Sequence, residues 1–380
     1  MRARLTLLSI LAVLLALNAG AQSSLTLPPD GENQHATVTQ YLGLVKVNID
    51  YNSPKVHNPR TGEDRRGKIW GTLVPYGMAK GLGYGTCTEC PWRVGANQNT
   101  VFTASNDIKV EGQPLAAGSY GLHMIPGQDE WTLIFSRNST SWGSFFYDPA
   151  DDALRVNVKP AKSDYHEYLT FEFPDRKLDR ATVAMKWEDL QVPFTVSVDN
   201  IAALYIDNIR KELKNAHGFS WVNYNAAARY AVDNKDPKDA LEWAKIAATN
   251  SFPGQENFTT LMTLADAQAA SGMEADATRT RDKAINLPGT TPIELHQYAR
   301  TLLQKGKKQE AFSVWQLNAK RHPNEWPVNV GLARGNSAVG NYKEALKYAK
   351  LALAQAPDDN NKKNLQTGIE KLEQGKDMNQ

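Results

Sequence analysis

The residues best suited to chemistry are two cysteines in the run Cys87-Thr88-Glu89-Cys90. A pair at this spacing can form a tight disulfide, act as a redox pair, or supply two of the four ligands that structural zinc requires. The loop around the pair is rich in glycine and lacks the βαβ pattern of a thioredoxin-like site. We therefore expect a structural disulfide, with a metal site and redox catalysis as alternatives.

Histidines could supply the ligands that such a metal site lacks, and the candidates are His57, His123 and His166. His123 follows Leu122 in a predicted strand, where side chains alternate between faces, so it can lie on the side opposite the core. The alternative metal site therefore consists of Cys87, Cys90 and His123, with zinc or another transition metal as cofactor. In the other interpretation His123 is satisfied within the fold and no cofactor is expected.

A second group of polar and aromatic residues follows the cysteines directly. Arg93 and Asn97 could bind an anionic or sugar-like ligand, Arg93 through paired hydrogen bonds and Trp92 through stacking. Equally, arginine and asparagine side chains hold loops by bonding to the backbone. The candidate ligand-binding residues are thus Trp92, Arg93, Asn97 and His123.

No catalytic residue can be named from the sequence. It lacks a Gly-x-Ser-x-Gly elbow, a phosphate-binding loop and a dinucleotide fingerprint after a strand. Whether the protein is an enzyme therefore stays open at this stage.

The first half of the chain has the period of β-strands. Between residues 43 and 198, apolar residues recur mainly at every second position, as in Val45, Val47, Ile49 and Tyr51. Turn signals separate about ten such runs, and no convincing helix lies between them. Residues 35–198 are therefore predicted to form an antiparallel β-sandwich or jelly-roll-like domain.

The second half has the period of helices and a longer repeat. Gly272, Gly306 and Gly340 lie 34 residues apart, and two series of alanines keep the same interval. The alanines are Ala265, Ala299 and Ala333, and Ala277, Ala311 and Ala345. A period of 34 residues is that of tetratricopeptide repeats. Residues 199–376 are therefore predicted to form an α-helical solenoid of roughly four hairpins, closed by a helix over 361–372, so the whole chain is an α+β multidomain protein.

The first residues follow the pattern of a secretory signal peptide. Arg2 and Arg4 precede an apolar run of about 13 residues, which is short of the roughly 20 that span a bilayer. The small residues Ala19, Gly20 and Ala21 then suit a signal peptidase. We expect residues 1–21 to be cleaved near Ala21, and the mature protein to be periplasmic, in the cell envelope or extracellular.

The charge of the chain argues against polyanionic partners. The whole chain has 43 basic and 41 acidic residues, and residues 1–21 hold two arginines and no acids. The predicted mature chain is therefore neutral overall, and we expect it not to bind nucleic acid, which attracts a basic excess. No stretch after the signal peptide is apolar enough to predict a membrane span.

Several short motifs of the first half resemble one bacterial family. They are Gly-Lys-Ile-Trp-Gly at 67–71, Leu-Val-Pro-Tyr-Gly at 73–77 and Trp-Arg-Val-Gly-Ala-Asn at 92–97, followed by motifs at 115–122, 125–127, 131–135 and Trp142-Gly143. The family is known as domain of unknown function 2911, and the resemblance covers about residues 35–195. It implies an exported protein and no established activity. The chain departs from the family pattern at 81–91, which looks like an insertion, and at His123.

Two hypotheses of function follow. The first is a binding or scaffolding protein of the cell envelope, because stacked helical hairpins build a concave surface that recognises proteins or peptides. The alternative is a periplasmic metal-binding or thiol-dependent enzyme centred on the loop of Cys87 and Cys90.

Overall fold

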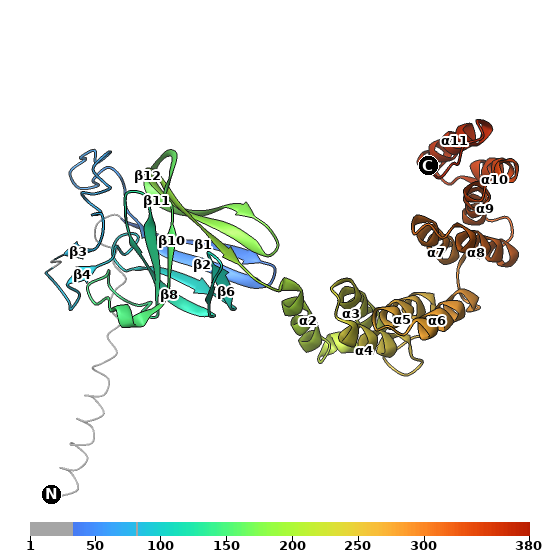
Figure 1. Cartoon of the computed structure of the whole chain (residues 1–380), viewed down its shortest axis with the longest axis horizontal. Helices are drawn as coiled ribbons and strands as arrows, with labels where there is room; N and C mark the ends of the chain where they lie inside the picture. The colour runs from blue at the N-terminus through green and yellow to red at the C-terminus, as the bar shows by residue number, and fades with distance from the viewer. Residues whose placement is uncertain (1–32, 81–82) are drawn as a thin grey trace, which may run out of the picture. The chain divides into compact units, whose positions relative to one another are not determined.

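The computed structural model describes residues 33–80 and 83–380, so the predicted signal peptide lies outside the described residues. The chain divides into two compact units, with the boundary between Ile201 and Ala202 (Figure 1). Within the described ranges, no helix combines the length and the apolar character needed to cross a membrane.

The first unit is built from two main antiparallel sheets (Figure 1). The larger sheet has six strands in the order β1-β2-β5-β8-β9-β10, and the smaller has four in the order β11-β12-β6-β7. A separate ribbon pairs β3 with β4. The strands are β1 (Gln34–Leu42), β2 (Val45–Ser53), β3 (Ala79–Lys80), β4 (Glu89–Cys90), β5 (Thr100–Ala104), β6 (Ile108–Val110), β7 (Gln113–Leu115), β8 (Gly118–Ile125), β9 (Trp131–Ser136), β10 (Asp152–Val158), β11 (Ala161–Arg176) and β12 (Arg180–Ser197).

The two main sheets pack face to face around an apolar core. In β2, Val45, Val47 and Ile49 are fully buried, while the residues between them are more exposed, as a period of two requires. Phe102 of β5 lies 5.2 Å, centroid to centroid, from Phe135 of β9, and both contact Phe194 of β12 in the other sheet. The predicted sandwich is therefore confirmed. The sequence missed the β3–β4 ribbon and the length of the β11–β12 hairpin.

The second unit is entirely helical in its regular structure and forms the predicted array of hairpins. Its helices are α2 (Ile201–Glu212), α3 (Trp221–Asp233), α4 (Pro237–Ala248), α5 (Phe258–Ala270), α6 (Glu274–Asn286), α7 (Pro292–Gln304), α8 (Lys308–Arg321), α9 (Trp326–Ala338), α10 (Tyr342–Gln355) and α11 (Asp359–Glu373). The pairs α3–α4, α5–α6, α7–α8 and α9–α10 are the four hairpins, and α11 is the predicted closing helix. The tetratricopeptide-like fold is confirmed.

The 34-residue period has a local physical cause. Gly272, Gly306 and Gly340 have φ of 76°, 78° and 87° in the turns between paired helices, a conformation that favours glycine. On the first helices of the same hairpins, Ala265 and Ala299 are fully buried. A small side chain there lets neighbouring helices approach closely.

The first helices of the hairpins form the inner layer of the array. Helix α3 packs directly against α5, and α7 packs against α9. The second helices of neighbouring hairpins, in contrast, contact one another little or not at all. A stack that is close on one side and open on the other must curve toward the close side. The first helices therefore line the concave side within the halves α3–α6 and α7–α10, whereas α5 and α7 contact each other little or not at all.

Helix α9 packs so closely against α8 that it uses glycine inside a helix. A Cβ added to Gly331 would lie 2.3 Å from Cδ1 of Trp315, whose side chain is fully buried. Replacing glycine by alanine usually stabilises a helix by about 1 kcal/mol. We predict that Gly331→Ala instead destabilises the array, because overpacking costs about 1–3 kcal/mol. Thermal unfolding followed by circular dichroism measures the change.

Gly368→Ala in α11 is the matched control. The nearest atom to its added Cβ is Cε of Met378 at 2.8 Å, at the end of a flexible side chain. This variant should keep or raise the melting temperature. A Gly331→Ala protein at least as stable as the wild type would contradict the close packing of α8 and α9.

Candidate functional site

The Trp92–Asn97 segment is a rigid loop held on the larger sheet. The amide of Trp92 donates to the carbonyl of Met124 at 2.8 Å, and that of Met124 returns a bond of 2.9 Å. Val94 and Asn97 have φ of 54° and 57°, in the left-handed region. The hydroxyl of Thr100 donates to the carbonyl of Val94 at 2.6 Å. These bonds fix where the side chains of Arg93 and Asn97 project.

Trp92 belongs to a cluster of four tryptophans between the sheets. Its ring stacks on Trp187 at 6.2 Å with an interplanar angle of 13°, and Trp70 packs edge-on against both. Trp131 completes the cluster, 5.2 Å from Trp70. Trp131 and Trp187 are buried. Trp92 thus contributes to core packing on the side next to Trp187. Together with Arg93 and Asn97 it also lines a cavity of about 550 Å³, so its role in ligand binding stays a prediction.

Arg93 fastens two loops together. Its Nη1 donates to the carbonyl of Asn97 at 2.8 Å, and its guanidinium lies 5.2 Å from the ring centroid of Phe145. A Cβ on Gly143 would lie 2.8 Å from Cζ of Arg93. Burial lowers the pKa of Arg93. No carboxylate pairs with it among the described residues, and its hydrogen bond and its ring contact hold the two loops together.

His123 is buried on the outer face of the larger sheet. Its neighbours Leu122 and Met124 point into the core, so the alternation along β8 places His123 on the opposite side. Its Nδ1 lies 2.9 Å from the hydroxyl of Ser144, and its ring lies 5.5 Å from that of Tyr147. Burial, together with the charge of Arg93, lowers the pKa of His123 to about 4. The histidine is therefore neutral at physiological pH.

Cys87 and Cys90 are joined in a disulfide. Cys90 lies in the β3–β4 ribbon opposite Ala79, and the amides of Thr86 and Cys87 both donate to the carbonyl of Phe145. The described ranges contain no group of three or more His, Cys, Asp or Glu side chains that could hold a metal ion. The structure therefore does not gather Cys87, Cys90 and His123 into one site.

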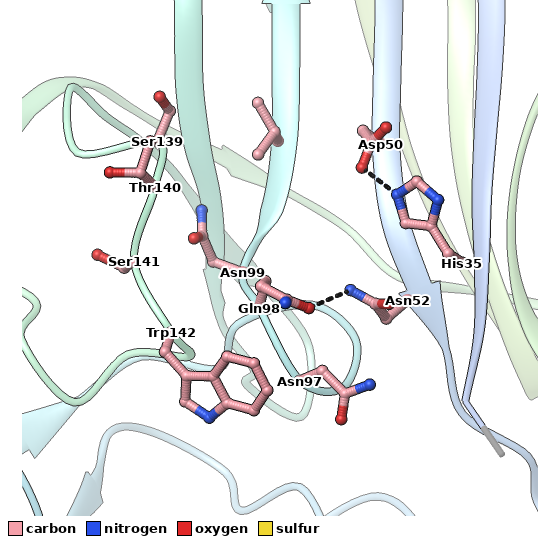
Figure 2. Close-up of a pocket in the computed structure, with 11 residues that line it drawn as sticks. His35, Asp50, Asn52, Asn97, Gln98, Asn99, Ser139, Thr140, Ser141 and Trp142 are labelled. Atoms are coloured by element: carbon pink, nitrogen blue, oxygen red, sulfur yellow. Dashed lines mark hydrogen bonds and ion pairs between the residues drawn. The ribbon is translucent and has the colours of Figure 1, made fainter. Parts of the chain in front are cut away.

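The sequence did not single out a cavity of about 690 Å³, lined mainly by polar residues, on the outer face of the larger sheet. Figure 2 shows the indole of Trp142 beside Asn97 and Gln98, across the cavity from His35 and Asp50. The cavity is lined by β1, β2 and β5 and by two loops: His35, Asp50, Asn52, Asn97, Gln98, Asn99, Val101, Ser139, Thr140, Ser141 and Trp142. Of the predicted site residues, only Asn97 lines it. The loops lie about forty residues apart in the sequence, so spacing alone gave no signal.

A second unforeseen site lies on the inner face of the array. The segment after α11, residues 376–380, folds back onto α9, and we call it the tail. The hydroxyl of Ser337 donates to Asp377 at 2.7 Å and accepts from the amide of Met378 at 2.9 Å. The amide group of Asn379 donates to the carbonyl of Arg334 at 3.0 Å and accepts from its Nη1 at 3.2 Å.

The tail is anchored by one apolar side chain and leaves a cavity beside it. Met378 is 9% exposed and packs with Ala333 of α9 and Leu372 of α11. The cavity has a volume of about 340 Å³, and the charged residues among those that line it are Arg300, Lys308, Arg334 and Asp377. Burial would raise the pKa of Asp377, but hydrogen bonds from Ser337 and Asn379 outweigh it and hold the pKa below its usual value.

Comparison with known proteins supports the family resemblance of the first unit. Residues 33–196 match the family model described as "Protein of unknown function (DUF2911)". The resemblance inferred from the motifs is therefore confirmed for this part of the chain. No protein of curated function matches the sequence.

The helical part is similar to solved structures at low scores. The crystal structure of MamA has a TM-score of 0.28 and 18% identity, covering 40% of this chain and 85% of that one. YrrB, a TPR protein with an unusual peptide-binding site, has 0.28 and 12%, covering 45% and 86%. PilF of Pseudomonas aeruginosa has 0.30 and 16%, covering 47% and 82%. Similarity at this level assigns no function to the array.

Acid should destabilise the first unit through His123. Its pKa of about 4 in the folded state lies below the value of about 6.5 for an unfolded histidine. The unfolded state therefore gains a proton first as the pH falls. The stability is complete above about pH 6.5 and decreases down to about pH 4, by on the order of 3 kcal/mol, then levels off. Thermal unfolding across this range measures the loss.

His123→Gln is the control, because glutamine can bond to Ser144 without titrating. The variant should show a flatter pH profile between about pH 6.5 and 4. An unchanged profile would mean that other groups cause the acid sensitivity.

Removing the disulfide should have a small effect. Its loop spans only three positions in sequence, so it restricts the unfolded chain little, and Cys87→Ser with Cys90→Ser should cost about 2 kcal/mol or less. Intact mass before and after reduction should differ by about two units in the wild type. A metal present in the wild type and absent from the double variant would instead support the metal alternative.

Proposed function

We propose that this chain, whose residues 33–196 match the DUF2911 family model, is an exported binding or scaffolding protein that engages a peptide segment of a partner on the inner face of its helical array. The observation that carries the proposal is the tail, a short segment of non-helical chain bound on that face. Export is supported by the signal-peptide pattern of residues 1–21 and by the disulfide, since disulfides persist in oxidising compartments.

The inner face presents a charged residue at the same position of every hairpin. On each first helix it follows the buried alanine directly: Arg229, Asp266, Arg300 and Arg334. The first three are exposed, whereas Arg334 is half-buried beneath the tail. The tail thus covers in the last hairpin a position that stays open in the other three.

The contacts of the tail are of the kind that recognise a peptide. Met378 fills an apolar site, while backbone and side-chain hydrogen bonds from α9 fix the residues on either side of it. A buried apolar side chain provides affinity, and the hydrogen bonds on either side of it fix the position of the peptide along the face. The face therefore accepts an acidic residue, an apolar residue and an amide in succession.

The charge around the tail favours an acidic partner. Arg300, Lys308 and Arg334 line the cavity beside the tail, and Asp377 is the one carboxylate among the side chains that line it. Burial lowers the pKa of Arg334, and the nearby charge of Arg300 lowers it further, while Asp377 acts in the opposite direction. A longer peptide with further Asp or Glu residues would offset this excess.

A chain that ends at Gly375 should bind the missing segment in trans. The probe is a fluorescently labelled peptide with the sequence of residues 376–380, Lys-Asp-Met-Asn-Gln, and the readout is fluorescence anisotropy. We expect a Kd between about 1 μM and 1 mM, because so short a peptide loses the advantage of being tethered. The full chain should bind it far more weakly, since its own tail occupies the site.

Arg334→Ala and Arg229→Ala, each in the shortened chain, form a matched pair. They occupy the same position of two hairpins, but only Arg334 contacts the tail. Arg334→Ala should weaken peptide binding about tenfold, while Arg229→Ala should leave it unchanged. Circular dichroism confirms that each variant is folded. A folded, shortened chain that does not bind the peptide at all would overturn the proposal.

A further inference from the structure

The cavity on the outer face of the larger sheet offers many hydrogen-bonding groups without partners. Within the described part of the chain, the side chains of Asn97, Ser139, Thr140 and Ser141 make no hydrogen bond to another residue. Gln98 accepts a bond of 3.2 Å from Asn52, which leaves its own amide hydrogens free. These groups are both donors and acceptors, so they can satisfy hydroxyl groups of a ligand.

An exposed indole stands beside these polar groups. Trp142 is 53% exposed and lies next to Asn97 and Gln98 at the cavity (Figure 2). Unlike Trp92, it is not covered by another aromatic ring among the described residues. An apolar ring surface beside free amides and hydroxyls suits a ligand that has one apolar face and a polar rim.

The lining residues also exclude other classes of ligand. They include no lysine or arginine, so the cavity does not favour a phosphate or another anion. The apolar side chains that line it are Trp142 and Val101. Asp50 is already engaged by His35 and by the hydroxyl of Thr37. The class of ligand that suits these lining residues is therefore a neutral molecule rich in hydroxyl groups.

The two loops that carry these side chains are held in place by Arg93. Its bond to the carbonyl of Asn97 fixes one loop, and its contact with Gly143 fixes the backbone next to Trp142. The amide of Asn99 donates to the carbonyl of Ser141 at 3.2 Å and joins the loops directly. The cavity is therefore formed before any ligand binds, which reduces the entropic cost of binding.

We propose that this cavity binds a neutral oligosaccharide. A sugar ring stacks on Trp142, and its hydroxyl groups bond to Asn97, Gln98 and the hydroxyls of residues 139–141. Arg93 acts as a positioning residue that does not touch the sugar. The site is independent of the peptide-binding face proposed for the array.

Isothermal titration of the full chain with neutral tetrasaccharides tests this proposal. The panel is cellotetraose, chitotetraose, xylotetraose, mannotetraose and maltotetraose, each at up to about 10 mM. At least one should bind and quench tryptophan fluorescence. Trp142→Ala should weaken its binding about tenfold or more, and Trp142→Phe should retain part of it. Asn97→Gly removes the amide while tolerating the positive φ, and should also weaken binding.

Phe146→Ala is the matched control. Phe146 is 56% exposed, lies four residues after Trp142 and does not line the cavity, so its variant should bind like the wild type. Near-ultraviolet circular dichroism verifies that the Trp142 variants are folded. The proposal is overturned if no tetrasaccharide of the panel binds, if a folded Trp142→Ala binds as the wild type does, or if a polyproline hexapeptide binds at Trp142 in their place.

Discussion

The array depends on the close approach of neighbouring helices at a small residue on each first helix. Ala228, Ala265, Ala299 and Ala333 are all fully buried. Because a buried alanine fixes how each helix is rotated, the residue after it must project on the same side in every hairpin. That constraint aligns the charged side chains of the inner face, and it places Arg334 where the tail can reach it. The alignment of charged residues on the inner face is thus a consequence of packing.

In the first unit, the packed core between the sheets similarly fixes the position of two surface loops. Trp92 belongs to the tryptophan cluster between the sheets, and Arg93, the next residue, reaches out to join two surface loops. Two adjacent residues therefore have different roles: Trp92 packs in the core, and Arg93 holds the loops at the surface. A scaffold that fixes its loops in this way can present polar groups at defined positions.

The sequence predicted the features that follow from a periodic residue pattern. It missed the contacts between segments that lie far apart in the chain. A period of two identified the sandwich, and glycines at 34-residue intervals identified the hairpins, because both patterns reflect local backbone geometry. Trp92 and Arg93 were recognised as a motif, but their partners, Trp187 and Gly143, lie far away in the chain. The cavity beside Trp142 and the docking of Met378 likewise join distant segments. No local pattern could reveal them.

In the proposed function, the inner face of the array binds a short peptide, and the tail is its first example. Amide hydrogen exchange at Met378 in the full chain tests this most directly, because that amide donates to Ser337 in a buried site. We expect exchange at least about a hundredfold slower than in the free peptide of residues 376–380. Exchange at the rate of the free peptide would show that the tail does not occupy the face, and would contradict peptide binding there.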